Sequence, residues 1–254
     1  MGSTDTKPNL VLVHSFPTNS ILLSGLIEFL EDYFNIYFID LPGCISTNPP
    51  LKKISLKNFS KYLDKKIEEI NLDQYIIGGI SFGYWVVSHA KLNNKCRGIL
   101  AVEPYINSRY VKVPLSYRIK YKILFWLLGF FELYRVLWKA DSLMKYYRKI
   151  ANYPLKRVET IMREFDAKTF YVITKTLMFY KDRPKFFDLP YVLLINPKDK
   201  IIDADKVHVL FERKVEKLLV VETKIGHYPR TVTKRYFQRI IPKETINQVL
   251  DFLA

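Results

Sequence analysis

The chain has 254 residues, 49% of them hydrophobic and 15% aromatic, which is enough for one large domain or a domain with an insertion and excludes an intrinsically disordered chain. The formal net charge of +15 draws attention to anionic partners, although the abundance of lysine, isoleucine and asparagine explains the basicity equally well as a bias of the source genome. Cys44 and Cys96 show no metal-ligand spacing, and no apolar signal segment opens the chain, so we expect a reduced, cytoplasmic protein.

The first hundred residues alternate between short apolar runs and amphipathic segments. The runs at 9–13, 36–39, 75–77 and 98–102 predict buried strands. One helix is predicted with Asn19 or Ser20 as its cap, and another begins after Ser55. Strands that alternate with helices predict a parallel sheet with helices on both faces.

This alternation stops after residue 104 and resumes near residue 191. Residues 105–187 contain one glycine, Gly129, and long stretches of helical periodicity such as 119–138 and 155–165. Beyond them, strands are predicted at 191–195 and 217–221, and helices at 204–211 and 243–253. The sequence therefore predicts an α/β core of residues 1–104 and 188–254, with a mostly parallel sheet, and an all-helical insertion at 105–187.

The segment from Gly79 to Gly83 reads Gly-Ile-Ser-Phe-Gly and lies between a predicted strand and an amphipathic run, which places Ser81 at the tip of a sharp turn. Such a turn needs small residues two positions either side of the serine, because the strand end and the helix start come too close for Cβ atoms there. The pattern fits a nucleophile and also an ordinary strand-to-helix junction, so other residues must decide between them.

A serine nucleophile needs a base that takes its proton and a carboxylate that orients the base. Of the four histidines, His14 follows the first strand, while His89 and His208 fall in predicted helices. His227 differs, because it lies in a glycine- and proline-flanked loop after the last predicted strand. We therefore predict His227 as the base.

The predicted acid is Asp199, which follows the strand 191–195 at the sheet edge where the serine also lies. Glu103, which ends the preceding strand, and Asp203, a turn beyond Asp199, are the alternatives. Asp40 also ends a strand, but its Asp-Leu-Pro-Gly context is typical of a turn, and we expect it to be structural.

Together these segments resemble the α/β-hydrolase superfamily over nearly the whole chain. Residues 14–17 are similar to its His-Gly-x-Pro oxyanion loop, 40–43 to its Asp-x-x-Gly segment and 79–83 to its nucleophile elbow, and the nucleophile, acid and base follow the family's order. The resemblance implies a cap formed by the insertion and an oxyanion hole made by the backbone N–H groups of Phe16 and Phe82. Ser15 departs from the family's usual glycine, which permits an unusual backbone angle.

We expect a serine hydrolase of carboxylic esters that forms an acyl-enzyme and requires no metal or organic cofactor. The aromatic and leucine content of the insertion predicts an apolar acyl pocket there. Lactones such as acyl-homoserine lactones, thioesters and acyl transfer are alternatives that use the same triad, and a small-ligand-binding protein without activity is the non-enzyme alternative. A serine at the elbow argues against haloalkane dehalogenases and epoxide hydrolases, whose nucleophile is an aspartate.

The inserted segment carries most of the net charge, since residues 105–185 hold 18 Lys and Arg against 6 Asp and Glu, a balance of +12. Its uncharged run at 123–131 is too short to span a bilayer, which takes about 20 residues. We expect a cap helix whose apolar face packs over the active site. The flanking Lys120, Lys122, Arg135 and Lys139 also fit weak contact with an anionic membrane. No nucleic-acid partner is expected, because no binding motif accompanies the charge.

Overall fold

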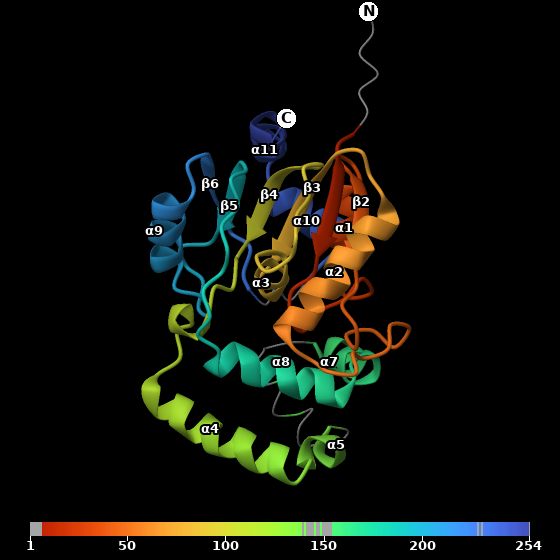
Figure 1. Ribbon diagram of the computed structural model, residues 1–254, viewed down its shortest axis with the longest axis vertical. Helices are drawn as coiled ribbons and strands as arrows, with labels where there is room; N and C mark the ends of the chain where they lie inside the picture. Colours follow the sequence, from red (N-terminus) through yellow and green to blue (C-terminus); the bar gives the residue numbers. More distant parts are fainter. Residues whose placement is uncertain are drawn as a thin grey trace, which may run out of the picture.

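The computed structural model describes residues 7–138, 140, 145, 148, 154–227, 229 and 231–253, so that Lys139 lies outside the described residues. Six strands form one sheet in the order β2-β1-β3-β4-β5-β6, and every neighbouring pair is parallel (Figure 1). The strands are β1 (Asn9–Val13), β2 (Asn35–Ile39), β3 (Tyr75–Ile80), β4 (Cys96–Val102), β5 (Tyr191–Ile195) and β6 (Leu218–Glu222). The predicted parallel sheet is confirmed.

Helices cover both faces of this sheet (Figure 1). Side chains alternate along each strand, so Val11 and Val13 of β1 join one apolar cluster while Leu10 and Leu12 join the other. The first cluster is closed by α2 (Leu56–Ile70), α3 (Phe82–Val87) and α9 (Ala204–Lys214), and the second by α1 (Ser24–Leu30), α10 (Lys234–Ile240) and α11 (Lys243–Leu253).

The starts of the first two helices differ in how well the sequence predicts them. Helix α2 begins after Ser55 as predicted, because the Ser55 hydroxyl accepts a hydrogen bond from the Asn58 N–H. Helix α1 begins later than predicted, and neither Asn19 nor Ser20 caps it. The Ser20 hydroxyl instead donates to Asp40 (2.6 Å), which confirms a structural role for that carboxylate.

The helices between β4 and β5 lie together beyond the carboxyl ends of the strands, with α8 nearer the sheet than α4 (Figure 1). They are the short 3-10 helix η1 (Ser108–Tyr110), α4 (Leu115–Phe130), α5 (Leu133–Leu137), α7 (Leu155–Glu164) and α8 (Ala167–Phe179). The stretch of helical periodicity at 119–138 forms two helices, which are separated at Phe131 and Glu132, where Glu132 takes a φ of 48°.

Helix α8 is joined to the core at the turn that follows β2. The N–H of Asp166, which caps α8, donates to the carbonyl of Gly43 (2.9 Å). Gly43 has a φ of 77°, and a Cβ added to it would lie 2.3 Å from Oγ1 of Thr169. The close approach of α8 to this turn therefore requires glycine.

The apolar run of α4 does not pack over the core. Phe125 is buried against Tyr171 and Phe179 of α8, but Trp126 and Phe130 are exposed. The expectation that the apolar face of this helix covers the active site is therefore wrong. Across the described residues, no helix combines the length and the hydropathy needed to cross a membrane.

Candidate active site

Ser81 stands at the turn between β3 and α3 with φ 49° and ψ −109°. A residue other than glycine rarely adopts this conformation, and such strain is concentrated at functional sites. Hydrogen bonds hold the turn: the Ser81 N–H donates to Val102 (2.9 Å), and its carbonyl accepts from the N–H groups of Tyr84 and Tyr105 (both 3.1 Å). The hydroxyl is thereby presented at the carboxyl edge of the sheet.

The two glycines around Ser81 are required for different reasons. A Cβ on Gly79 would lie 2.4 Å from Cα of Tyr84, so the strand end and the helix start do approach each other as predicted. A Cβ on Gly83 would lie 2.3 Å from the carbonyl oxygen of Val13. The small size of Gly83 is therefore imposed by the neighbouring strand β1 rather than by the turn itself.

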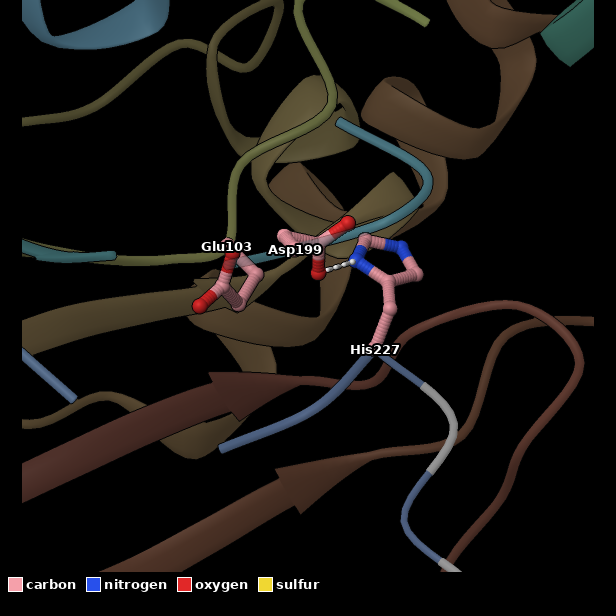
Figure 2. A group of neighbouring side chains, drawn as sticks. All are labelled: Glu103, Asp199 and His227. Carbon is pink, nitrogen blue, oxygen red and sulfur yellow. Dashed lines mark hydrogen bonds and ion pairs between the residues drawn. The ribbon is translucent and has the colours of Figure 1, made fainter. Parts of the chain in front are cut away.

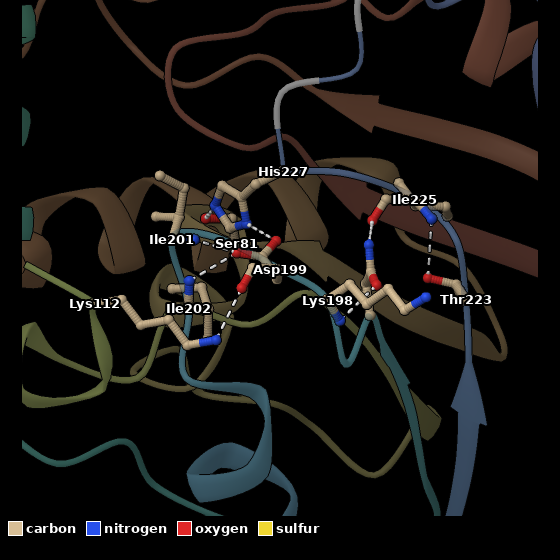
Figure 3. Close-up of polar contacts among 10 residues, drawn as sticks. Ser81, Lys112, Lys198, Asp199, Ile201, Ile202, Thr223, Ile225 and His227 are labelled. Carbon is tan, nitrogen blue, oxygen red and sulfur yellow. Dashed lines mark hydrogen bonds and ion pairs between the residues drawn. The ribbon is translucent and has the colours of Figure 1, made fainter. Parts of the chain in front are cut away.

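The structure brings the predicted nucleophile, base and acid together. The Ser81 Oγ lies 2.9 Å from Nε2 of His227 (Figure 3). The Nδ1 of His227 lies 3.2 Å from Oδ2 of Asp199 (Figures 2 and 3). Because Nδ1 carries a proton toward the carboxylate, Nε2 is left with the lone pair that accepts the serine proton. These side chains come from the ends of β3, β5 and β6, which are far apart in the sequence.

Asp199 is held by the backbone on its other oxygen. Its Oδ1 accepts hydrogen bonds from the N–H groups of Ile201 (2.6 Å) and Ile202 (2.8 Å), and Lys112 donates to its carbonyl (2.9 Å; Figure 3). Burial raises the pKa of Asp199, but the hydrogen bond and charge of His227, with the two backbone donors, outweigh burial and lower it below its ordinary value. The carboxylate therefore stays ionised beside the imidazole.

Glu103, the alternative acid, lies beside this pair but does not join it (Figure 2). It is 3% exposed, and among the described residues neither carboxyl oxygen meets a donor at hydrogen-bond geometry. Burial, and then the charge of Asp199, raise the pKa of Glu103 to about 9 against a smaller opposing effect of the Asn196 backbone, so it is protonated at neutral pH. The other alternative, Asp203, instead caps α9 by accepting from the Lys206 N–H.

Glu103, Asp199 and His227 are also the donor types that metal ions use, and their nearest ligand atoms lie within 4.8 Å of one another. A metal there would need an ionised Glu103 and the free lone pair of His227 Nδ1. Glu103 is protonated and Nδ1 faces Asp199, so these donors fit a hydrogen-bonded catalytic pair better than a metal site.

The predicted oxyanion donors belong to two segments whose side chains are in contact, since the Phe16 ring packs against the Phe82 ring. Phe82 is the first residue of α3, Phe16 follows β1, and in the described part of the chain neither N–H donates to a backbone acceptor. The Phe16 ring packs against Phe82, Phe165 and Phe170, with ring centroids 6.4, 5.8 and 4.8 Å away. The loop after β1 that contains Phe16 is thus held between α3 and the inserted helices.

Ser15 takes the place of the family's glycine without a left-handed backbone, since it is not among the residues with positive φ. Its carbonyl accepts from the Thr18 N–H (3.2 Å), the Thr18 hydroxyl (2.8 Å) and Nδ1 of His14 (2.7 Å). These donors stabilise the loop, so a side chain is tolerated where the resemblance predicts glycine.

His14 is fully buried and structural. Its Nδ1 donates to Ser15, and its Nε2 accepts from the N–H of Leu41 (2.9 Å). Burial lowers its pKa against the opposing effect of Asp40, so the ring is neutral and links the oxyanion loop to the turn after β2. His208 lies on α9 as predicted, whereas His89 follows α3 rather than lying within it.

A cavity of about 90 Å³ is lined by Ser81 and His227. It extends along the face of the sheet that α1, α10 and α11 cover. Most of its other walls are apolar, and they include Leu12, Leu26, Leu30, Leu100, Leu194, Phe237, Ile241, Ile246 and Val249. Ser15, Thr18 and Glu103 are polar residues that also line it. Among the described residues of the insertion, Arg157 alone lines it. The expectation that the insertion supplies the apolar pocket is not met, because the core itself supplies this one.

No protein-family model matches the sequence. A curated relative, the pimeloyl-[acyl-carrier protein] methyl ester esterase of Pseudoalteromonas atlantica, is 30% identical over 86 residues, which cover 34% of this chain and 32% of that protein. The chain thus spans about a third of the length of this relative.

Two solved structures are similar over almost the whole chain. The esterase EaEST from Exiguobacterium antarcticum has a TM-score of 0.66 at 12% identity and covers 98% of this chain and 93% of its own. The enol-lactonase from Burkholderia xenovorans has a TM-score of 0.63 at 13% identity, with 99% and 93% covered. Together with the parallel sheet and the strained serine turn, these likenesses show that the chain has the α/β-hydrolase fold.

Proposed function

We propose that the protein is a serine hydrolase that cleaves carboxylic esters through an acyl-enzyme intermediate. The observation that carries the proposal is the hydrogen-bonded series from Ser81 through His227 to Asp199 beside an apolar cavity. The activities named for the curated esterase and for the two similar structures support ester chemistry over other uses of the fold.

In the first half-reaction, Ser81 Oγ attacks the carbonyl carbon of the ester while His227 Nε2 takes its proton. Asp199 stabilises the imidazolium that forms and keeps the ring in place. The negative charge on the former carbonyl oxygen is stabilised by the N–H groups of Phe16 and Phe82. The tetrahedral intermediate collapses as the imidazolium returns the proton to the departing alcohol.

In the second half-reaction, a water molecule takes the place of the alcohol. His227 accepts a proton from this water as it attacks the acyl carbon, and the same oxyanion donors act again. Collapse of the second intermediate breaks the bond to Ser81 Oγ, which recovers its proton from His227. The acid product leaves, and the neutral histidine is restored.

The substrate that this site favours carries an apolar acyl group. The cavity next to Ser81 is walled by leucine, isoleucine, valine and phenylalanine side chains, which offer hydrocarbon contacts and few polar ones. We further propose that residues 105–187 act as a cap over the mouth of the site. Lactones are the second candidate substrates, on the strength of the similar enol-lactonase structure, because ring opening uses the same attack and the same oxyanion.

The proposal is tested with p-nitrophenyl esters and a fluorophosphonate probe. The wild type should hydrolyse the esters and be labelled by the probe, while Ser81→Ala should lose labelling and activity by a factor on the order of 10⁴ or more. Ser88→Ala is a matched control, since Ser88 is a buried serine at the end of α3 whose hydroxyl bonds to Trp85. Activity retained by Ser81→Ala contradicts the proposal.

A further inference from the structure

The outermost helix of the insertion carries an apolar face that nothing in the described structure covers. Phe125 and the small Gly129 face α8, where the Tyr171 hydroxyl donates to the Phe125 carbonyl (2.6 Å). The rest of the surface of α4 therefore points away from α8. Figure 1 shows α4 running along α8 on the side remote from the sheet.

An exposed stripe on the part of α4 that does not face α8 is formed by Ile119, Ile123, Trp126 and Phe130, and it continues into Phe131. We call these five residues the outer apolar face. The four residues of α4 share an arc of about 60° at about 100° per residue. Trp126 is 60% and Phe130 67% exposed, although they stack with centroids 5.3 Å apart. Exposed apolar side chains grouped in this way mark a contact surface, unlike single ones scattered over a protein.

Basic residues flank the outer apolar face on both sides. The helical period places Lys120 on one side of the stripe, about 90° from its centre, and Lys122 on the other, about 70° from it. The segment 115–137 contains four Lys and Arg and one acid, Glu132, which pairs with Arg135 at 3.0 Å. An apolar stripe between lysines is the pattern of a helix that lies in the interface of an anionic bilayer.

We propose that the outer apolar face of α4 binds the surface of an anionic lipid bilayer, with Trp126 and Phe130 entering the headgroup region and Lys120 and Lys122 contacting lipid phosphates. Charge favours this occupant over a second copy of the chain. Two such faces brought together would bring two copies of residues 105–185 close to each other, each with a charge balance of +12, and like charges repel. A bilayer offers hydrocarbon and negative charge at once.

The surface and the catalytic residues lie on different elements, so binding does not depend on Ser81. Docking would set the carboxyl edge of the sheet, where the serine lies, toward the membrane, since the inserted helices project from that edge (Figure 1). An apolar ester that is poorly soluble in water and dissolves in the bilayer would then be close to the site. This gives the apolar cavity a source of substrate.

Binding of the full-length protein is measured by co-sedimentation with two kinds of vesicle. One is pure phosphatidylcholine, and in the other about one lipid in three is the anionic phosphatidylglycerol. We expect binding to the anionic vesicles that weakens as salt is added. Lys120→Gln/Lys122→Gln should bind about 25-fold more weakly, at about fivefold for each lysine. Phe130→Asp should abolish binding, while Val209→Asp should not, because Val209 is an exposed apolar residue (43%) on α9, away from the face.

Tryptophan emission gives a direct readout of insertion. Of the three tryptophans in the sequence, all within the described residues, Trp85 and Trp138 are buried and Trp126 is exposed. A blue shift on adding anionic vesicles, lost in Trp126→Phe, is the expected result.

Absence of anionic-vesicle binding at moderate salt, or equal binding by wild type and Phe130→Asp, overturns the proposal. So does a wild type that sediments as a dimer through this face and ignores vesicles. Ser81→Ala should bind vesicles like the wild type, so failure of the proposed hydrolase activity is distinguished from failure of membrane binding.

Discussion

Replacing Glu103 by glutamine should change how the stability of the protein depends on pH. In the folded protein the pKa of Glu103 is raised from 4.5 to about 9, chiefly by burial, whereas the unfolded chain releases this proton near its ordinary pKa. Between these values the folded state holds a proton that the unfolded state has lost, so rising pH destabilises the fold. The slope is about 1.4 kcal/mol per pH unit, or on the order of 4 kcal/mol between pH 5 and pH 8.

Glutamine has nearly the same shape as the protonated acid and does not titrate, so Glu103→Gln should lack this slope. The assay is urea unfolding of wild type and variant at pH 5, 6, 7 and 8, where their free energies of unfolding should agree near pH 5 and diverge in favour of the variant as pH rises. Glu222→Gln is the control, since Glu222 is an exposed acid at the end of β6. Parallel curves for wild type and Glu103→Gln would refute the assignment of a protonated Glu103.

Three further predictions concern the site and its supports. Asp199→Asn should lower kcat by a factor on the order of 10⁴ with little change in KM, because an amide no longer favours the productive tautomer of the base; an undiminished kcat would move the acid role elsewhere. Gly83→Ala should lower the melting temperature by several degrees, because its Cβ would lie 2.3 Å from the Val13 carbonyl oxygen. Gly226→Ala is the control and should be tolerated, because no atom lies within 4 Å of the added carbon. Similar melting temperatures for the two variants would contradict this prediction. Leu26→Trp should reduce hydrolysis of long-chain p-nitrophenyl esters more than that of the acetate, because Leu26 lines the cavity and the larger ring fills it; an unchanged chain-length profile would show that the acyl group binds elsewhere.

The core of the fold is well determined by local sequence patterns. The runs that predict β1 and β5 match those strands residue for residue, because buried parallel strands are short, apolar and closed by turn residues at both ends. The predicted nucleophile, base and acid meet because parallel strands present their carboxyl ends at one edge, so residues that follow separate strands become neighbours.

Other features depend on tertiary contacts that no local pattern reports. Helix α10 was not predicted, although Thr233 caps it and Phe237 is its buried anchor, because the helix has only 7 residues and its apolar side chains do not form a long periodic pattern. The apolar run of α4 gives no sign of which side packs against α8, since nearly all of its residues are apolar. The protonation of Glu103 likewise follows from burial beside Asp199, which only the assembled sheet creates.

The position of the insertion between β4 and β5 has a consequence for how the protein folds. Val102 pairs with Leu194, so closing the sheet at this point joins residues more than ninety positions apart. Chain-closure entropy grows slowly, and a connection about four times shorter would save only about 1.2 kcal/mol. The core can therefore accept changes of length in this connection at small energetic cost. Ser81 precedes the connection while Asp199 and His227 follow it, so ester hydrolysis is expected to recover during refolding only after β4 and β5 have paired.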